Sequence, residues 1–213
     1  GTPGEVTIIA TQPGDATYAP AIPVFQTFEV TPPPPGNCVA AGTISREVWN
    51  NVPGTAVSDI PINDPPDIED ELTIFEIPVN AGNEYGTRIR GYVCPPATGN
   101  YTFWIASDDN GQLWLSTNSD PANKQLIASV PGWTSSRQWD KYPEQQSAPI
   151  NLIQGQSYYI EALQKEDGGG DNLAVGWQLP DASLERPIGS NRISPFDEGG
   201  GGTDQTITFD PIP

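Results

Sequence analysis

Short runs in which apolar and polar residues alternate recur along the chain, and turn-forming residues separate them. Alternation with a period of two is typical of half-buried β-strands. No stretch holds apolar residues at helical spacing over ten or more positions, so we expect little helix. The pattern predicts an all-β fold, an antiparallel two-sheet sandwich of jelly-roll type. The candidate strands read TISREVW, ELTIFEIPV, TRIRGYVC, YTFWIAS, QLWLS, KQLIAS, PINLI, SYYIEALQ and LAVGWQLP.

The large apolar side chains of these runs are expected in the core or on a sheet face. Each could instead form a flat platform on which a sugar ring stacks. Packing within the sandwich is the simpler interpretation. These residues are Phe103, Trp104, Trp114, Tyr159, Leu163 and Trp177.

The pattern divides the chain into three parts, residues 1–36, 37–196 and 197–213. The first part holds two alternating runs, EVTIIATQ and VFQTFEV, and ends in four consecutive prolines, which form a stiff spacer. The last part reads as a glycine-rich linker followed by the start of a strand. Both ends resemble fragments of immunoglobulin-like repeats, and the chain lacks methionine. We therefore expect a monomeric module of a long multidomain chain, with the sandwich at residues 37–196.

The chain is strongly acidic, with 27 acidic and 9 basic residues and a formal charge of −18 at pH 7. Such a charge repels nucleic acid and anionic lipid but attracts cations. We expect no nucleic-acid partner. No run of eighteen apolar residues occurs, so we also expect no membrane insertion. The acidic run DPPDIEDE at 64–71 is interpreted as a solvated face.

Histidine is absent and cysteine occurs only as Cys38 and Cys94. The lack of histidine excludes Ser-His-Asp triads, Cys-His pairs and histidine-based metal sites. A bond between the two cysteines would close a long loop and stabilise the fold by roughly 4 kcal/mol in the chain-entropy model. Two buried thiols are the alternative. We predict the disulfide and a secreted, cell-surface location.

Two adjacent carboxylates, Asp108 and Asp109, precede the Asn110-Gly111 pair in ASDDNGQLWLS, residues 106–116, which reads as a hairpin. Neighbouring side chains of a strand point to opposite faces, so an ordinary strand would not let both grip one ion. A cis peptide bond would bring the two Cα atoms to about 2.9 Å and allow both carboxylates to face one point. A divalent cation is the obvious occupant of such a point.

Ca²⁺ takes 6 to 8 oxygen ligands, more than two aspartates supply. The second acidic segment, QKEDGGGDN at 164–172, lies between two long candidate strands. Its glycines would let backbone carbonyls turn toward an ion. A phosphate-binding loop is disfavoured by the acidic neighbours and the missing lysine pattern. From these residues alone, two solvated turns remain the simpler interpretation.

Three long stretches resemble the protective-antigen β-sandwich family, also called the PA-fourteen domain, over most of residues 37–196. They read GYVCPPATGNYTFWIASDDNGQLWLS, WDKYPEQQSAPINL and YYIEALQKEDGGGDNLAVGWQLPD. Some members of that family, notably yeast flocculins and large RTX-type bacterial adhesins, are lectins. In those members an Asp-cis-Asp pair and a nearby loop hold Ca²⁺, which binds neighbouring hydroxyls of a sugar. Other members do not bind sugar, so membership leaves that point open.

The resemblance implies a set of site residues for this chain. The implied metal ligands are Asp108, Asp109, Gln164, Gly169 and Asp171, with Asp167 as a lesser candidate. The implied sugar contacts are Asp108, Asp109, Gly170, Asp171 and Asn172.

Our leading hypothesis is a calcium-dependent lectin of a bacterial cell-surface adhesin, acting in cell adhesion and biofilm formation. Its partners would be cell-surface glycans or polysaccharides, with glucose- and fucose-type sugars as candidates. The alternative is a calcium-rigidified spacer without a ligand of its own. An enzyme is not expected, because Asp108 and Asp109 are adjacent rather than placed across a cleft, as a glycosidase pair would be.

Overall fold

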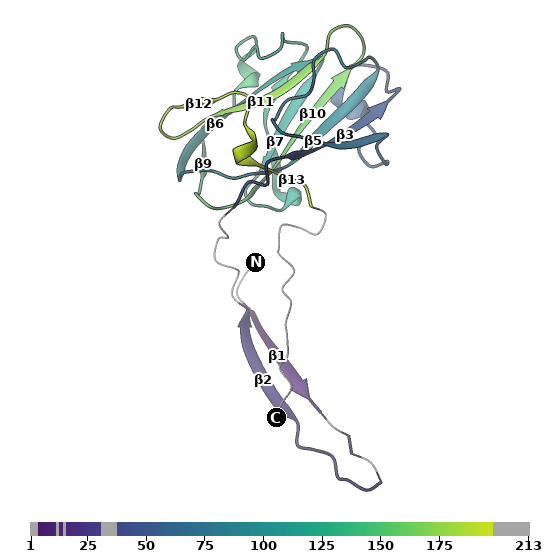
Figure 1. Cartoon of the computed structure of the whole chain (residues 1–213), viewed down its shortest axis with the longest axis vertical. Helices are drawn as coiled ribbons and strands as arrows, with labels where there is room; N and C mark the ends of the chain where they lie inside the picture. The colour runs from purple at the N-terminus through teal and green to yellow at the C-terminus, as the bar shows by residue number, and fades with distance from the viewer. Residues whose placement is uncertain (1–3, 12, 15, 31–37, 198–213) are drawn as a thin grey trace. The chain divides into compact units, whose positions relative to one another are not determined.

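The computed structural model describes residues 4–11, 13–14, 16–30 and 38–197, in two compact units, residues 1–36 and 37–213. In the first unit β1 (Gly4–Ala10) pairs antiparallel with β2 (Val24–Val30), with Gly4 opposite Val30 (Figure 1). Both alternating runs predicted there form strands. The proline run and the expected strand beyond residue 197 lie outside the described residues.

The second unit is an antiparallel β-sandwich, which confirms the predicted fold class. Figure 1 shows its two sheets. Within the described residues, the larger sheet has the order β4-β3-β5-β10-β7-β8, with β13 also pairing with β5, and the smaller sheet has the order β12-β11-β6-β9. The larger sheet contains β3 (Ile44–Asn50), β4 (Ile68–Leu72), β5 (Tyr85–Val93), β7 (Gly111–Ser116), β8 (Lys124–Val130), β10 (Tyr158–Glu166) and β13 (Ile193–Pro195). The smaller sheet contains β6 (Gly99–Asp108), β9 (Ile150–Leu152), β11 (Asn172–Gln178) and β12 (Leu184–Glu185).

Helix is limited to four 3-10 turns in the described chain, as the missing helical periodicity predicts. They are η1 (Val57–Asp59), η2 (Pro121–Asn123), η3 (Pro143–Gln145) and η4 (Ser190–Arg192). In this part of the chain no helix has the length and apolarity needed to cross a membrane.

The main core lies between the two sheets and follows the alternation along each strand. On β6, Tyr101, Phe103 and Ile105 belong to this core, whereas Trp104 between them faces the other side of the sheet. Trp177 of β11 packs against Tyr101 with ring centroids 5.0 Å apart. Phe103 and Trp177 therefore lie in the core, as predicted.

The outer face of the larger sheet carries a second, smaller apolar cluster. It joins Leu163 of β10 and the half-buried Trp114 of β7 to Trp49, Val52, Val57 and Ile60. The segment after β3 therefore covers this face. Leu163 and Trp114 are sheet-face residues, as predicted.

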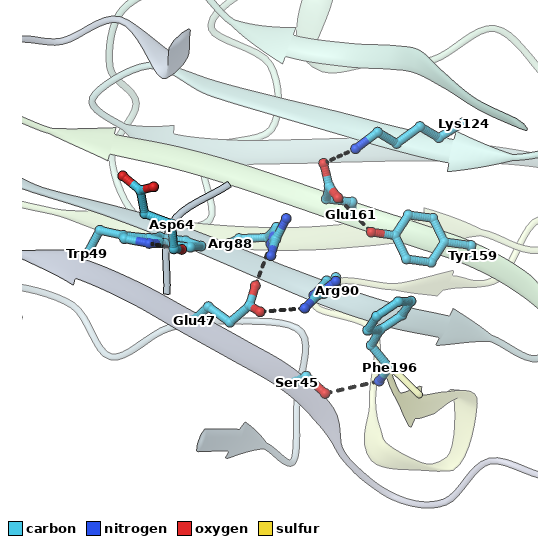
Figure 2. Close-up of polar contacts among 10 residues, drawn as sticks. All are labelled: Ser45, Glu47, Trp49, Asp64, Arg88, Arg90, Lys124, Tyr159, Glu161 and Phe196. Carbon is cyan, nitrogen blue, oxygen red and sulfur yellow. Dashed lines mark hydrogen bonds and ion pairs between the residues drawn. The ribbon is translucent and has the colours of Figure 1, made fainter. Parts of the chain in front are cut away.

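Two ion-paired networks complete the same outer face (Figure 2). Glu47 of β3 pairs with both Arg88 and Arg90 of β5. Glu161 of β10 accepts hydrogen bonds from the Lys124 ammonium and from the Tyr159 hydroxyl, each at 2.6 Å. Both carboxylates are buried, and each has charged or hydroxyl partners. The Glu47 pairs join the neighbouring strands β3 and β5, and the Lys124–Glu161 pair links β8 to β10 across β7.

The predicted hairpin at residues 106–116 is wrong. β6 pairs with β9 and β11, whereas β7 pairs with β8 and β10, so the two strands belong to different sheets. The chain crosses from one sheet to the other at Asp109 and Asn110. The Asn-Gly pair stands where the chain leaves β6 and enters β7, but it could not show which sheet the next strand would join.

The predicted strand ELTIFEIPV is shifted. The strand is β4, formed by Ile68–Leu72, and it pairs with β3 at the edge of the larger sheet. Beyond it, Ile74 and Glu76 make only isolated bridges, to Gly189 and Ala174, because this segment crosses toward the smaller sheet. The acidic side chains of β4 are exposed, as predicted for a solvated face.

A disulfide joins Cys38 and Cys94 across a sequence separation of 56 residues, with a Cα–Cα distance of 5.4 Å. It ties the start of the sandwich to the residue that follows β5.

Candidate metal and sugar site

Four strand ends converge at one end of the sandwich. β6 ends at Asp108 and β11 begins at Asn172, and these two residues are direct antiparallel partners. In the other sheet β10 and β7 pair so that Gln164 lies opposite Gly111. The crossing between the sheets and the 167–171 loop therefore meet at the same point.

Three carboxylates gather at this end. Asp108, Asp109 and Glu166 each place one oxygen within 4.8 Å of the others. The Asp108–Asp109 peptide bond is cis, as the resemblance implies. Glu166 is fully buried, with an exposed fraction of 0%.

Asp171 adds a fourth carboxylate, held by a segment that the sequence did not indicate. Its Oδ2 accepts a hydrogen bond from the Gly82 amide at 2.9 Å, and its carbonyl accepts one from the Asn80 amide at 3.1 Å. In the same segment the Asn83 side chain accepts from the Gly169 amide at 3.1 Å. Gly169 has φ +118°, a left-handed conformation that favours glycine. Residues 80–84 thus brace the 167–171 loop.

Several buried oxygens of the site have no hydrogen-bond partner among the described residues. They are Gln164 Oε1, both carboxylate oxygens of Glu166, Asp171 Oδ1, Asn172 Oδ1 and the hydroxyl oxygen of Tyr85. Buried acceptors without partners are rare in folded proteins and destabilise them. The Gln164 amide nitrogen, by contrast, donates to the Asp108 carbonyl at 2.6 Å.

Burial and the crowding of like charges raise the pKa of two carboxyls. Burial, and then the charges of Asp109, Asp108 and Asp171, raise the pKa of Glu166 to about 7, against the opposing effect of the Asp109 amide. Burial and then Asp109 and Asp171 raise the pKa of Asp108 to about 6, against the opposing charge of Lys141. Burial and Asp171 also raise the pKa of Tyr85. The site therefore holds concentrated negative charge, which Lys141 and the buried Lys165 balance only in part.

The residues present fit a calcium ion. Apart from the Tyr85 hydroxyl, the unpartnered atoms are carboxylate and amide oxygens, which are the ligands that hard divalent cations prefer. A cation would supply the missing partners for the buried oxygens and offset the repulsion that raises the two pKa values.

The structure places most of the predicted site residues at this end of the sandwich. Asp108 and Asp109 lie in the cluster with Glu166, and the charge of Asp171 acts on both Asp108 and Glu166. Gln164 lies in β10 rather than in a loop, and its Oε1 is unpartnered. Gly169 and Gly170 lie in the 167–171 loop; a Cβ on Gly170 would be 3.9 Å from Asp108 Oδ2 and 3.3 Å from Asn80 Oδ1.

Asn172 is buried in β11, and its side-chain nitrogen donates to the Thr134 carbonyl at 2.9 Å. This bond braces the segment around Thr134, whereas Asn172 Oδ1 has no partner among the described residues; the sugar contact of Asn172 stays a prediction.

Glu166 is the residue that the sequence prediction missed, because the acidic segment was treated as one loop from Gln164 to Asn172. β10 continues through Glu166. Ile160 and Ala162 belong to the core, and continuing the alternation by four residues places Gln164 and Glu166 on the same inward face. That alternation was the signal that could have found Glu166.

These features define an all-β sandwich module with an acidic, oxygen-rich site where its two sheets meet. Residues 40–190 match the model of the PA14 domain, and the chain belongs to this family. The likeness to the protective-antigen fold is thereby confirmed.

Among curated proteins, the chain is 40% identical over 108 residues to mouse N-acetyl-beta-glucosaminyl-glycoprotein 4-beta-N-acetylgalactosaminyltransferase 1, covering 47% of this chain and 10% of that protein. It is 31% identical over 119 residues to dog fibrocystin, covering 53% of this chain and 3% of that protein. The chain thus spans a tenth or less of the length of these relatives.

Solved structures share the fold. The PA14 sugar-binding domain from an RTX adhesin aligns with a TM-score of 0.56 and 13% identity over 74% of this chain and 100% of that chain. The epithelial adhesin 9 A domain from Candida glabrata, solved in complex with Galb1-4GlcNAc, aligns with a TM-score of 0.53 and 15% identity over 79% of this chain and 98% of that chain.

Proposed function

We propose that this module is a calcium-dependent lectin of an extracellular adhesin. The observation that carries the proposal is the cluster of Asp108, Asp109 and Glu166, whose carboxylate oxygens lie within 4.8 Å of one another beside buried oxygens without partners.

The chain's own residues have distinct roles in this proposal. Asp108, Asp109, Glu166 and Asp171 supply the negative charge, and Gln164 supplies a neutral oxygen through Oε1. A bound Ca²⁺ with an incomplete shell accepts two neighbouring hydroxyls of a sugar in place of water. Asp108 and Asp109 are only half-buried, so they form the side of the cluster that a sugar can reach.

The rim of the site provides contacts that could select a sugar. Gly170 carries no side chain, which leaves room for a ring beside Asp108. Trp133 is 52% exposed, and its neighbour Thr134 donates its amide to the Ser107 carbonyl at 2.7 Å. Ser107 immediately precedes Asp108, so this hydrogen bond holds the segment of Trp133 close to the cluster. There the Trp133 ring can contact the apolar face of a sugar.

The comparisons support this function without identifying the sugar. Two solved structures with this fold are a PA14 sugar-binding domain from an RTX adhesin and an adhesin domain in complex with Galb1-4GlcNAc. The candidate ligands are therefore galactose-, glucose- and fucose-type glycans with neighbouring hydroxyls. The disulfide agrees with an extracellular location.

We propose binding rather than catalysis. The buried carboxylates of the outer sheet face, Glu47 and Glu161, are each engaged in ion pairs, which supports a structural role. Affinity for a monosaccharide should be weak, about mM to high μM, because few atoms are buried. Adhesion would then depend on many copies acting together.

Calorimetry with a panel of monosaccharides, in millimolar Ca²⁺ and again in EDTA, tests the proposal. We expect heat of binding only with Ca²⁺. Asp109→Asn should weaken Ca²⁺ and sugar binding together, since the substitution keeps the shape and removes the charge. Asp70→Asn on exposed β4 should change neither. Sugar binding that survives EDTA, or an unchanged affinity in Asp109→Asn, would reject the mechanism.

The alternative is a spacer that calcium rigidifies. The observation that favours it is the separate hairpin unit preceding the sandwich, as in a chain of modules. A rise in melting temperature with Ca²⁺, together with no response to any sugar of the panel, would support this reading over the lectin.

A further inference from the structure

A second cleft, with a volume of about 570 Å³, lies against the outer face of the smaller sheet. It is lined by Trp104 of β6, residues 137–143, Gln146 and Arg186. Trp104 points away from the core that Phe103 and Ile105 enter. None of the four carboxylates of the candidate calcium site lines this cleft.

The floor of the cleft depends on a glycine. Gly176 of β11 is the cross-strand partner of Trp104, and a Cβ there would lie 2.3 Å from Arg186 Cγ. The missing side chain lets the arginine stem lie directly on the sheet. The Arg186 Cζ is then 5.0 Å from the Trp104 ring centroid and 5.8 Å from that of Trp139.

The opposite wall is held in place by one buried amide. Gln145 donates to the carbonyls of Ile105 and Gln138 at 2.8 and 2.7 Å. Its Oε1 accepts from the amides of Lys141 and Tyr142 at 2.8 and 2.9 Å. Because all four bonds run to the backbone, the segment that carries Trp139 is preorganised.

The charges of the cleft are unusual for so acidic a chain. All nine basic residues lie within the described residues, and six of them form ion pairs with carboxylates. Arg186 and Lys141 are not among those six. Lys141 donates to the Trp133 carbonyl at 2.6 Å and lies 3.0 Å from the Trp133 ring centroid. For the Arg186 guanidinium, the described residues provide ring contacts but no hydrogen bond or ion pair.

A guanidinium that contacts aromatic rings through its face keeps its in-plane N–H groups for other partners. Those donors match a carboxylate, which they can bind in a bidentate manner. The remaining lining suits a sugar ring: Trp139 and Tyr142 provide apolar surface, and Gln138 and Gln146 provide amides for hydroxyls. Asp140 also lines the cleft and opposes an anion. Of the basic residues in the lining, Arg137 pairs with Glu76 and Lys141 donates to the Trp133 carbonyl, which leaves Arg186 to bind the carboxylate.

We propose that this cleft is a second, metal-independent subsite for a carboxylate-bearing sugar ring of the hexuronic acid class. The Arg186 guanidinium binds the carboxylate, and Trp104 and Trp139 flank it. None of the groups of this subsite is a proposed metal ligand, so it can bind its ligand while the candidate calcium site is empty.

Ligand-observed NMR on the full chain in EDTA tests this subsite, with methyl β-glucuronide compared with methyl β-glucoside. EDTA removes any contribution from the calcium site, so the two proposals can fail separately. We expect saturation transfer to the glucuronide, and at least about fivefold weaker binding of the glucoside, which lacks the charge-assisted hydrogen bonds.

Variants make the test specific. Arg186→Gln should weaken glucuronide binding about fivefold to tenfold, and Trp139→Ala should weaken it too. The matched control is Arg46→Gln, which removes an equal charge from the opposite sheet, where Arg46 pairs with Asp70. It should leave binding unchanged.

Three outcomes would overturn the proposal. They are equal binding of glucoside and glucuronide, an Arg186→Gln variant that binds as well as the parent with an unchanged melting temperature, and inorganic sulfate competing as strongly as the glucuronide. The last outcome would show that the cleft recognises charge without the ring.

Discussion

At the scale of single residues, Glu166 sets the character of the candidate site, because it is fully buried and its carboxylate lacks a partner. Glu166→Gln should act in opposite directions with and without Ca²⁺. In EDTA the neutral amide removes repulsion and can donate to Asp108 or Asp109, so the melting temperature should rise by about 2–4 °C, equivalent to about 1 kcal/mol. Calcium affinity should fall by about tenfold or more, since a charged ligand is lost.

Thermal unfolding in EDTA and calcium calorimetry check this prediction. The control is Glu69→Gln, which makes the same chemical change on the exposed strand β4 and should alter neither quantity. A lower melting temperature of Glu166→Gln in EDTA would show that the carboxylate has a stabilising partner after all.

The same cluster should make stability depend on pH. The folded-state pKa values of Asp108 and Glu166, about 6 and about 7, exceed their ordinary values of 3.8 and 4.5. Between those limits the folded protein binds more protons than the unfolded chain, so the stability from this cluster is complete below about pH 4 and is lost as pH rises through about 7. Without Ca²⁺, the melting temperature should therefore fall from pH 5 to pH 8.

Calcium affinity should rise with pH, because Ca²⁺ competes with protons for these carboxylates. We expect calcium affinity to be more than about tenfold weaker at pH 5 than at pH 8. Melting curves and calorimetry at both pH values provide the measurement. In Glu166→Gln, both the melting temperature and the calcium affinity should change less with pH than in the parent. A calcium affinity that does not vary with pH would contradict the assignment of these carboxylates as ligands.

At the scale of elements, the 80–84 segment holds the 167–171 loop against the strand ends. Asn83→Ala removes the acceptor for the Gly169 amide, which costs about 1 kcal/mol and corresponds to about a fivefold loss of calcium affinity if the loop contributes ligands. Calorimetry checks this. Asn151→Ala, which removes a side-chain bond to Asn100 on the smaller sheet, is the control and should leave the affinity unchanged. Equal calcium affinities of Asn83→Ala and Asn151→Ala would exclude the loop from the calcium site.

Strands could be predicted where the signal was the local alternation of apolar and polar residues. The prediction failed where strand pairing depends on residues far apart in the sequence. The alternation in YTFWIAS and SYYIEALQ identified β6 and β10, and the adjacent aspartates identified the acidic half of the site. The Asn110-Gly111 pair did not indicate that β7 joins the other sheet, because strand pairing is set by contacts between residues far apart in the sequence. For the same reason the bracing by Asn80 and Gly82 left no signal near Asp171.

At the scale of the whole molecule, net charge and local charge have separate consequences. The formal charge of −18 predicts an affinity for cations, and the acidic cluster that would bind one lies where the sheets meet. The net charge did not indicate the cleft lined by Arg186 and Lys141. Composition averages over the surface, whereas the fold determines which charges are paired. Two binding surfaces of opposite charge can therefore exist on one sandwich.

The disulfide should stabilise the sandwich without affecting the candidate calcium site. β5 runs nine residues from Tyr85, beside Asp171, to Val93 next to Cys94, so the bond lies roughly 25–30 Å from the site. Replacing both cysteines with serine should lower the free energy of unfolding by about 4 kcal/mol, because the unfolded chain regains the freedom of a closed loop. Chemical denaturation and calcium calorimetry measure the two effects, and calcium affinity should stay within about twofold. As a control, a reducing agent should lower the melting temperature of the parent but not of the double variant. A tenfold loss of calcium affinity in the double variant would show that the two ends of β5 are coupled through the sheet.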